Sequence, residues 1–198
     1  MLKKTTALGT AFLLLLGTLW ATSVKPVNLQ EMVGSAERIF WGSCVRVEET
    51  ALPSGLVATQ YTFQVRRGLK GVEAGEMVTF RQLQSTDRQS LKIPGLPTFR
   101  KGQESLIFLY GESRLGLTSP VGLQQGVFRV EQTEQGLSVI NALENSNLDY
   151  DLPEINMRSA GLAGRERDLL SSKQPIPLDT FAALVAKFDR LNQQRADQ

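Results

Sequence analysis

The stretch Val57-Ala-Thr-Gln-Tyr-Thr-Phe-Gln-Val-Arg66 (VATQYTFQVR) carries the strongest structural signal in this 198-residue sequence. Every second residue, from Val57 through Tyr61 to Val65, belongs to an apolar or β-branched set that alternates with more polar side chains. Successive side chains of a β-strand point to opposite faces, so this period of two predicts a strand with one buried and one wet face. The sequence therefore indicates a mainly β fold built outward from this strand.

A strand on the N-terminal side is predicted over Arg38–Glu48, across a turn that contains Pro53 and Gly55. We expect the two strands to form an antiparallel pair, because a short turn joins them. The expected apolar face of the first strand consists of Ile39, Trp41, Val45 and Val47.

On the C-terminal side, a third strand is predicted over Met77–Leu83, and Ser105–Tyr110 is a continuous apolar run typical of a strand buried on both faces. Glycines mark turns between the shorter strands expected further along. Those shorter strands are Leu115–Thr118, Gly126–Glu131 and Leu137–Asn141.

Helices are predicted at both ends of the β region. Asn28 and Glu31 have the spacing of a capping box, which predicts a short helix leading into the first strand. Towards the C-terminus, Asp179 is the expected N-cap of an amphipathic helix over 178–195. Its apolar residues at helical spacing are Phe181, Leu184, Val185, Phe188 and Leu191.

The domain organisation that follows has four parts. Residues 1–23, with Lys3 and Lys4 before an apolar run, predict a secretory signal peptide and hence a secreted or periplasmic protein. The alternative is an uncleaved membrane anchor. Residues 24–143 form the expected β-barrel domain, residues 144–177 are polar, and 178–195 is the C-terminal helix. Composition leaves open whether 144–177 is an ordered wrap or a loosely held linker.

The charge balance disfavours partners that need a strong field. The chain has 22 Lys and Arg against 20 Asp and Glu, and removing Lys3 and Lys4 with the signal leaves 20 of each, a net charge of zero. A neutral protein has no net field to attract nucleic acid or anionic lipid. We expect no nucleic-acid partner, and membrane contact only if the N-terminal segment is retained.

Missing residue types exclude many chemistries. The chain has no His and one Cys, Cys44. A Ser-His-Asp or Cys-His centre, a His-ligated metal, a CxxC pair and an internal disulfide are therefore excluded. The adjacent Glu48 and Glu49 point to opposite faces of a strand and make a poor acid–base pair. We expect no catalytic residue and no cofactor, with Cys44 either buried beneath the N-terminal helix or available for an intermolecular bridge.

A calcium site is one hypothesis for the segment 144–154. Asn145, Asn147, Asp149 and Asp151 stand at alternate positions and carry the oxygen ligands that Ca²⁺ prefers. The segment departs from an EF-hand loop, and the alternative is ordinary use of Asn and Asp in turns. Asn147, Asp149 and Asp151 are the calcium candidates, and no other metal site is expected.

A partner-binding surface is predicted in the long loop 84–103, which has no hydrophobic period. A loop of this length in a compact domain is functional or mobile. The candidate contact residues are Leu96, Pro97, Thr98, Phe99 and Arg100. Phe99 is the expected aromatic anchor, and the alternative is that Phe99 packs inside the barrel.

Three motifs together resemble the start of netrin-like domains, a family that includes tissue inhibitors of metalloproteinases: Ser35-Ala-Glu-Arg-Ile-Phe-Trp-Gly42, Phe63-Gln-Val65 and Leu69-Lys-Gly71. They also resemble uncharacterised secreted bacterial proteins that carry a later Phe-x-x-Gly-x-x-x-Leu-x-Phe-Leu motif, present here from Phe99 to Leu109. The resemblance covers residues 35–109. It implies an OB-like Greek-key β-barrel of five strands or more, a fold used mainly for binding.

The inhibitors place the amine and carbonyl of a mature N-terminal Cys on the protease zinc and pin that Cys with disulfides. This chain would begin near Val24 after cleavage and has neither feature, so no inhibitory residue is carried over. We therefore expect a secreted or periplasmic, non-catalytic module that binds another secreted or envelope protein through the 84–103 loop. The alternatives are a structural envelope protein that docks through its C-terminal region, and a carboxylate-based hydrolase.

Overall fold

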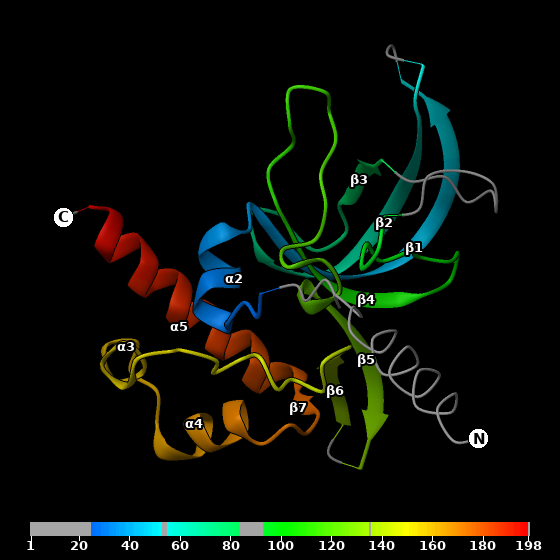
Figure 1. The fold of residues 1–198 in the computed structure, drawn as a ribbon. Helices are drawn as coiled ribbons and strands as arrows, with labels where there is room; N and C mark the ends of the chain where they lie inside the picture. Colours follow the sequence, from blue (N-terminus) through cyan, green and yellow to red (C-terminus); the bar gives the residue numbers. More distant parts are fainter. Residues whose placement is uncertain (1–24, 53–54, 84–92, 135, 198) are drawn as a thin grey trace, which may run out of the picture.

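A computed structural model describes residues 25–52, 55–83, 93–134 and 136–197, which contain one curled antiparallel sheet (Figure 1). In this part of the chain the sheet has seven strands in the order β3-β2-β1-β4-β5-β6-β7. They are β1 (Arg38–Ala51), β2 (Val57–Lys70), β3 (Met77–Gln82), β4 (Glu104–Leu109), β5 (Val127–Thr133), β6 (Gly136–Asn141) and β7 (Ile176–Pro177). The predicted mainly β architecture is confirmed, and the described residues form seven strands in one curled sheet, where a closed barrel of five strands or more was expected. The expected signal peptide and residues 84–92 lie outside the described residues.

β1 and β4 form the centre of the molecule, and they pair antiparallel over six residues. Adjacent side chains of β4 enter different cores: Leu106 and Phe108 belong to one, and Ile107 and Leu109 to the other. This position explains the unbroken apolar run of the segment. The prediction of a strand buried on both faces is confirmed.

The first core lies inside the curl of β3, β2, β1 and β4. Tyr61, Phe63, Phe80 and Phe99 fill it, with neighbouring ring centroids between 5.1 and 5.9 Å apart. Three register shifts interrupt the β1–β2 pairing. Because such bulges increase the local twist, they curl this part of the sheet into a half-barrel around the rings.

One register shift also reverses the faces of β1. Arg46 pairs with Thr62 directly after Cys44 pairs with Phe63, so Val45 is the extra residue of a bulge. Beyond it, Val47 packs on the same core as Cys44. The expectation that Val47 shares a face with Ile39 is wrong, because the prediction assumed an uninterrupted alternation.

The segment that follows β4 connects the two ends of the half-barrel. Residues 110–119 form a hairpin that stands away from the sheet (Figure 1). The arm that returns from the hairpin, residues 117–121, is hydrogen-bonded to β4 and β3. Val121 N donates to Phe108 O at 2.8 Å, and Thr118 N donates to Arg81 O at 2.9 Å. The predicted strand Leu115–Thr118 is not formed, because these residues make the turn and the returning arm of this hairpin.

The second core lies on the opposite face of β1 and β4, against two helices. α2 (Leu29–Ser35) begins as predicted, since the Asn28 side chain accepts a hydrogen bond from Glu31 N at 2.9 Å. The predicted C-terminal helix is confirmed as α5 (Leu178–Ala196), with its apolar face in this core. Asp179 is not its N-cap: Pro177 occupies that position, and Asp179 lies in the first turn and pairs with Arg67.

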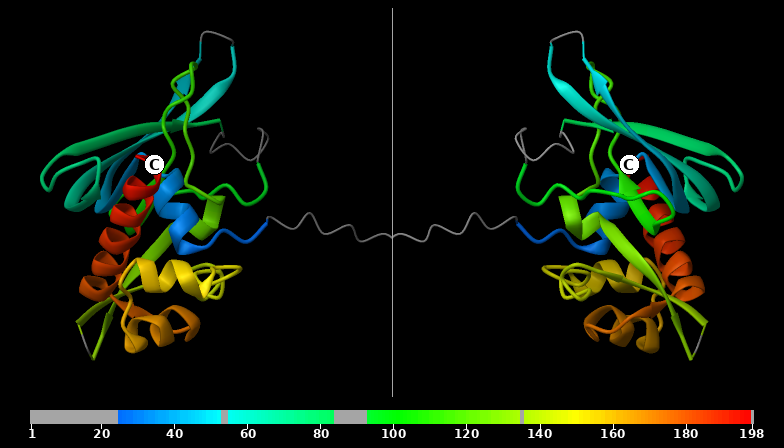
Figure 2. Two further views of the ribbon diagram at one scale, coloured as in Figure 1. Left: turned by 90° about the vertical axis from the view of Figure 1, so that its left-hand side faces the viewer. Right: turned by 90° about the vertical axis from the view of Figure 1, so that its right-hand side faces the viewer.

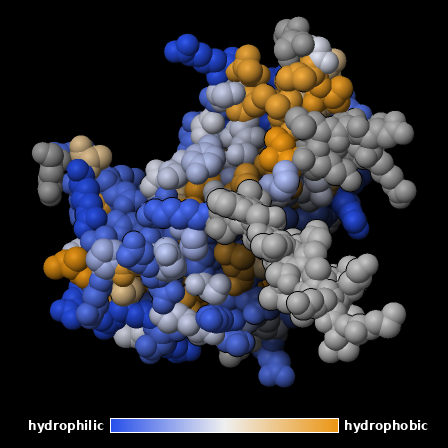
Figure 3. All heavy atoms as spheres, viewed as in Figure 1, coloured by the Kyte–Doolittle hydropathy of each residue, from blue (hydrophilic) through white to orange (hydrophobic). Residues whose placement is uncertain are grey.

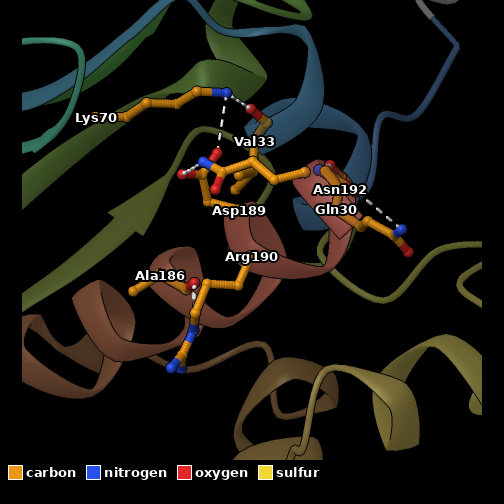
Figure 4. A network of polar contacts seen from close by, with 8 residues as sticks. Gln30, Val33, Lys70, Ala186, Asp189, Arg190 and Asn192 are labelled. Carbon is orange, nitrogen blue, oxygen red and sulfur yellow. Dashed lines mark hydrogen bonds and ion pairs between the residues drawn. The ribbon is translucent and has the colours of Figure 1, made fainter. Parts of the chain in front are cut away.

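The side-chain ammonium group of Lys70 connects β2 with α2 and α5 (Figure 4). Lys70, at the end of β2, donates to Val33 O at 2.8 Å and lies 3.1 Å from an Asp189 carboxylate oxygen. The adjacent Gly71 has a φ of +64°, and a Cβ there would lie 2.3 Å from Glu37 O, so glycine allows the strand to end against the start of β1. Among the described residues, no helix combines the length and apolar composition needed to cross a membrane.

The polar tract 144–177 is an ordered wrap in this structure. It contains α3 (Glu154–Ser159), α4 (Gly164–Ser171) and β7, which pairs with β6 (Figure 2). Widely spaced apolar residues anchor it in the second core: Leu148, Leu152, Leu162, Leu170 and Ile176. These anchors share no single helical or strand period, because they come from α4, from β7 and from irregular segments between the elements.

We predict that two adjacent residues of β4, Leu106 and Ile107, contribute about equally to the stability of the fold. Leu106→Ala and Ile107→Ala should each lower the free energy of unfolding by about 2–5 kcal/mol, because each leaves a cavity in a different core. Urea unfolding measures both, with Gln64→Ala on the exposed face of β2 as a control expected within about 0.5 kcal/mol of wild type. A loss for only one of the pair would contradict burial on both faces.

Candidate functional site

An apolar groove separates the segment 93–96 from the hairpin 110–119. Its volume is about 370 Å³, within the range of roughly 300–1,000 Å³ typical of ligand sites. The apolar side chains that line it are Leu83, Ile93, Leu96, Tyr110, Leu117 and Leu123. The groove is thus formed partly by the predicted binding loop and partly by a hairpin that the sequence did not single out.

A tight turn shapes the first wall. Leu96 N donates to Ile93 O at 3.2 Å, and Gly95 has a φ of +79° after Pro94. Proline followed by glycine of positive φ is the signature of a type II turn. A Cβ on Gly95 would lie 3.3 Å from a Leu123 methyl carbon, so the turn lies close against the floor of the groove.

Local hydrogen bonds hold the second wall. Ser113 N donates to Leu117 O at 2.8 Å, and the Ser113 hydroxyl accepts from Leu117 N at 3.2 Å. Lower in the hairpin, the Thr118 hydroxyl donates to Tyr110 O at 2.8 Å. These contacts within the chain hold the shape of the hairpin, and with it the second wall of the groove.

Exposed apolar side chains surround the groove. Leu115, at the hairpin tip, is 69% exposed, and Tyr110 and Ile93 are 39% and 36% exposed. The β1–β2 hairpin adds Leu56 and Val57, and apolar surface gathers at the end of the molecule where the two hairpins terminate (Figure 3). A contiguous exposed apolar patch is a better indicator of an interaction surface than single exposed apolar residues are.

The structure separates the five predicted contact residues. Phe99 is only 4% exposed and packs between Tyr61 and Phe63, so it is not an exposed anchor, and the alternative position inside the half-barrel is the observed one. Leu96 is buried and lines the groove. The others are buried Pro97 and exposed Thr98 and Arg100.

Pro97 and Thr98 instead line a separate hollow of about 390 Å³. Arg129 and Glu144 also line this hollow, so its charge is mixed. The segment 93–103 therefore has an apolar groove at one end and a polar hollow at the other.

Two of the three calcium candidates, Asn147 and Asp149, already make hydrogen bonds within the chain. Asn147 Oδ1 accepts from Asn141 Nδ2 at 2.8 Å, and Asn147 Nδ2 donates to Val27 O at 2.6 Å. Asp149 accepts from the Ser171 hydroxyl at 2.6 Å. Asp151 is exposed and has a φ of +52°, as Asp tolerates in turns. Among the described residues, no group of three or more His, Cys, Asp or Glu side chains has the geometry to hold a metal ion.

Four of the described titratable groups have a shifted pKa. Burial raises the pKa of the Cys44 thiol and of the Tyr61 hydroxyl in the half-barrel core. Hydrogen bonds from Arg158 and from Lys187 lower the pKa of Glu154 and of Glu166, respectively. The side chains that line the groove are mainly apolar.

No protein-family model and no curated protein matches this sequence. The netrin-like resemblance stays a prediction. The sequence contained signals for the hairpin that completes the groove, namely Gly111, Ser113 and Gly116 after an apolar strand. Gly111 and Gly116 predict turns between strands, but periodicity does not show which turns project from the sheet.

Cys44 is free and buried, although it lies in the half-barrel core with Phe40 and not beneath α2. We predict that a thiol reagent labels the native protein at least about 100-fold more slowly than the urea-unfolded protein, equivalent to an opening free energy of about 3 kcal/mol. The absorbance of the thiolate that the reagent releases on reaction with Cys44 measures both rates. Fast native labelling would support an intermolecular bridge instead.

Glu166 and Lys187 join α4 to α5, and Lys187 Nζ lies 2.6 Å from both carboxylate oxygens. The pKa of Glu166 is lowered in the folded state, so its ionised form stabilises the fold at neutral pH, and the stabilisation is lost as pH falls through the folded pKa. We predict that Glu166→Gln lowers the free energy of unfolding by up to about 1 kcal/mol at pH 7 and leaves it unchanged near pH 3.

Thermal unfolding of wild type and Glu166→Gln between about pH 7 and pH 3 tests this dependence. Glu73→Gln, at an exposed position, provides the control for loss of a single charge. A pH-independent difference between Glu166→Gln and wild type would contradict the ion-pair explanation.

Proposed function

We propose that this protein is a secreted or periplasmic, non-catalytic binding module that grips an extended segment of another secreted or envelope protein in the apolar groove. The observation that carries the proposal is the preformed groove between Leu96 and Tyr110, in which Tyr110 and Ile93 are exposed. Preformed apolar pockets surrounded by exposed apolar residues are typical of sites that receive an anchoring side chain.

The scaffold supports this proposal through its topology. The order β3-β2-β1-β4 places the fourth strand beside the first, as in a Greek key. The arm 117–121 runs antiparallel to β4 and reaches β3, which is where an OB-like barrel has its fifth strand. Loops projecting from a rigid barrel commonly carry binding sites.

The chemistry of the groove favours an apolar anchor in a peptide over a charged ligand. Its side chains are aliphatic or aromatic, apart from hydroxyls such as Ser113 and Thr118. One hydroxyl, that of Thr118, is already donated to Tyr110 O. A charged group placed here would lose its hydration without gaining an opposite charge among these lining residues.

The two alternative functions receive less support. Docking through the C-terminal region would need an unpaired apolar face on α5, but Phe181, Leu184, Val185 and Phe188 lie in the protein's own second core. A carboxylate-based hydrolase would need shifted carboxylates in a cleft, whereas Glu154 and Glu166 are paired with Arg158 and Lys187.

The test uses two tyrosines that are similarly exposed. Tyr110 lines the groove, whereas Tyr150, 49% exposed, lies in the wrap. A photocrosslinking phenylalanine analogue at position 110, expressed in the native envelope, should give an adduct of one defined mass that the same analogue at position 150 does not give. Mass spectrometry then identifies the partner.

With the purified partner, Tyr110→Ser should weaken binding by about 2 kcal/mol, or roughly 30-fold in Kd, as expected for an aromatic anchor. Tyr150→Ser should leave Kd unchanged within about twofold, and both variants should keep the wild-type unfolding transition. Equal adducts at both positions, or equal Kd values for both variants, would reject the groove as the binding site.

A further inference from the structure

A polar pocket separate from the apolar groove lies where α2, the wrap and α5 meet. Its volume is about 450 Å³, and it shares no lining residue with the groove. The polar side chains of the lining belong mainly to two kinds, amides and carboxylates. The amides are Asn28, Gln30, Asn156 and Asn192, and the carboxylates are Glu31 and Asp151.

A directed chain of hydrogen bonds orients three of the amides. Arg195 donates to Asn156 Oδ1 at 2.7 Å, and Asn156 Nδ2 donates to Gln30 Oε1 at 2.9 Å. Gln30 Nε2 in turn donates to Asn192 Oδ1 at 3.1 Å. The chain ends where Asn192 Nδ2 donates back to Gln30 O at 3.2 Å (Figure 4). Each amide therefore has a fixed orientation at the pocket wall.

These hydrogen bonds use about half of the donors and acceptors of the three amide side chains. A side-chain amide has two N–H donors and an oxygen that accepts two hydrogen bonds. Within the described part of the chain, Gln30, Asn156 and Asn192 each have one side-chain donor and one side-chain acceptor engaged. The remaining donors and acceptors are available to a bound molecule, and it must supply both kinds of group close together.

Docking of α2 on α5 does not by itself require this arrangement. The same helices already meet through apolar residues of the second core, among them Met32 and Leu191. Gln30 is buried and Asn156 and Asn192 are partly buried, and a network of amides in such places is costly unless every member finds partners. Its position at a pocket wall is therefore better explained by a ligand than by helix packing alone.

The carboxylates narrow the chemistry of that ligand. Glu31 and Asp151 are exposed and, when ionised, only accept hydrogen bonds, so a ligand meets them with donors such as paired hydroxyls. Their negative charge disfavours phosphates and other anions. Leu152 and Pro153 add apolar surface that suits the C–H face of a sugar ring.

We infer that this pocket binds a neutral polyhydroxylated ligand of the saccharide class. The amides contact hydroxyl or acetamido groups, the carboxylates accept from a hydroxyl pair, and Leu152 and Pro153 contact the ring. The site works without the apolar groove, so its test and that of the proposed function are independent.

The experiment is a ¹H–¹⁵N NMR titration of the chain from residue 24 onward with glucose, N-acetylglucosamine and cellobiose, each up to about 100 mM, well above a millimolar Kd. At least one sugar should shift the side-chain amide signals of Gln30, Asn156 and Asn192 with saturation. Glucose 6-phosphate and trialanine serve as the anionic and peptide probes.

Two exposed helical glycines provide a matched pair of variants. A Cβ at Gly34 would lie 3.0 Å from Asn192 Nδ2, whereas a Cβ at Gly164 would meet nothing within 4 Å. Gly34→Leu should weaken sugar binding at least about tenfold by filling the pocket wall, while Gly164→Leu leaves Kd unchanged. Leucine favours helix relative to glycine, so both variants should fold, which circular dichroism checks.

Glu31→Gln provides a second variant that keeps the side-chain shape. It should weaken binding about threefold or more, because a neutral acceptor replaces a charge-assisted one. The inference is overturned if no sugar gives a saturable shift, if Gly34→Leu and Glu31→Gln both bind like wild type, or if glucose 6-phosphate or trialanine binds as tightly as the sugars.

Discussion

The antiparallel pairing of β1 with β4 is the constraint on which the rest of the structure depends. β4 and the part of β1 that pairs with it contribute to both cores, so each must supply apolar side chains at consecutive positions, as Ile39 and Phe40 do in β1. One face closes over the rings of Phe63, Phe80 and Phe99, and the other meets the α2, α5 and wrap layer through Phe108. Removing water from both faces of one pair holds two hydrophobic cores in a single domain.

The surface features follow from this arrangement. Because Phe99 packs in the aromatic core, the loop that contains it lies against the half-barrel. Only the residues on either side of Phe99 are left to form surface sites. The hairpin 110–119 supplies the opposite wall of the apolar groove, and the α2–α5 junction leaves amides at the edge of the second core. The two proposed sites thus differ in chemistry because they border different layers.

The sequence predicted the elements with a strong local signal. The period of two in residues 57–66, the apolar run 105–110 and the helical spacing after Asp179 all correspond to observed elements. The bulge at Val45 was not predictable from the sequence pattern, because an extra residue shifts the alternation without changing composition.

The candidate sites were harder to predict for a related reason. Phe99 was a plausible anchor in a long loop, and only its packing between Tyr61 and Phe63 shows that it belongs to the core. The amides of Gln30, Asn156 and Asn192 lie far apart in the sequence and meet only through the tertiary fold. Single-residue propensities carry no information about such meetings.

The β1–β4 pairing also determines how the chain must fold. Arg38 pairs with Leu109 and Ser43 with Glu104, sequence separations of 71 and 61 residues. Closing a loop of that size precedes any reward from either core, and contacts between distant residues slow folding. Neither core can be completed before this closure, so both should form in the same late step.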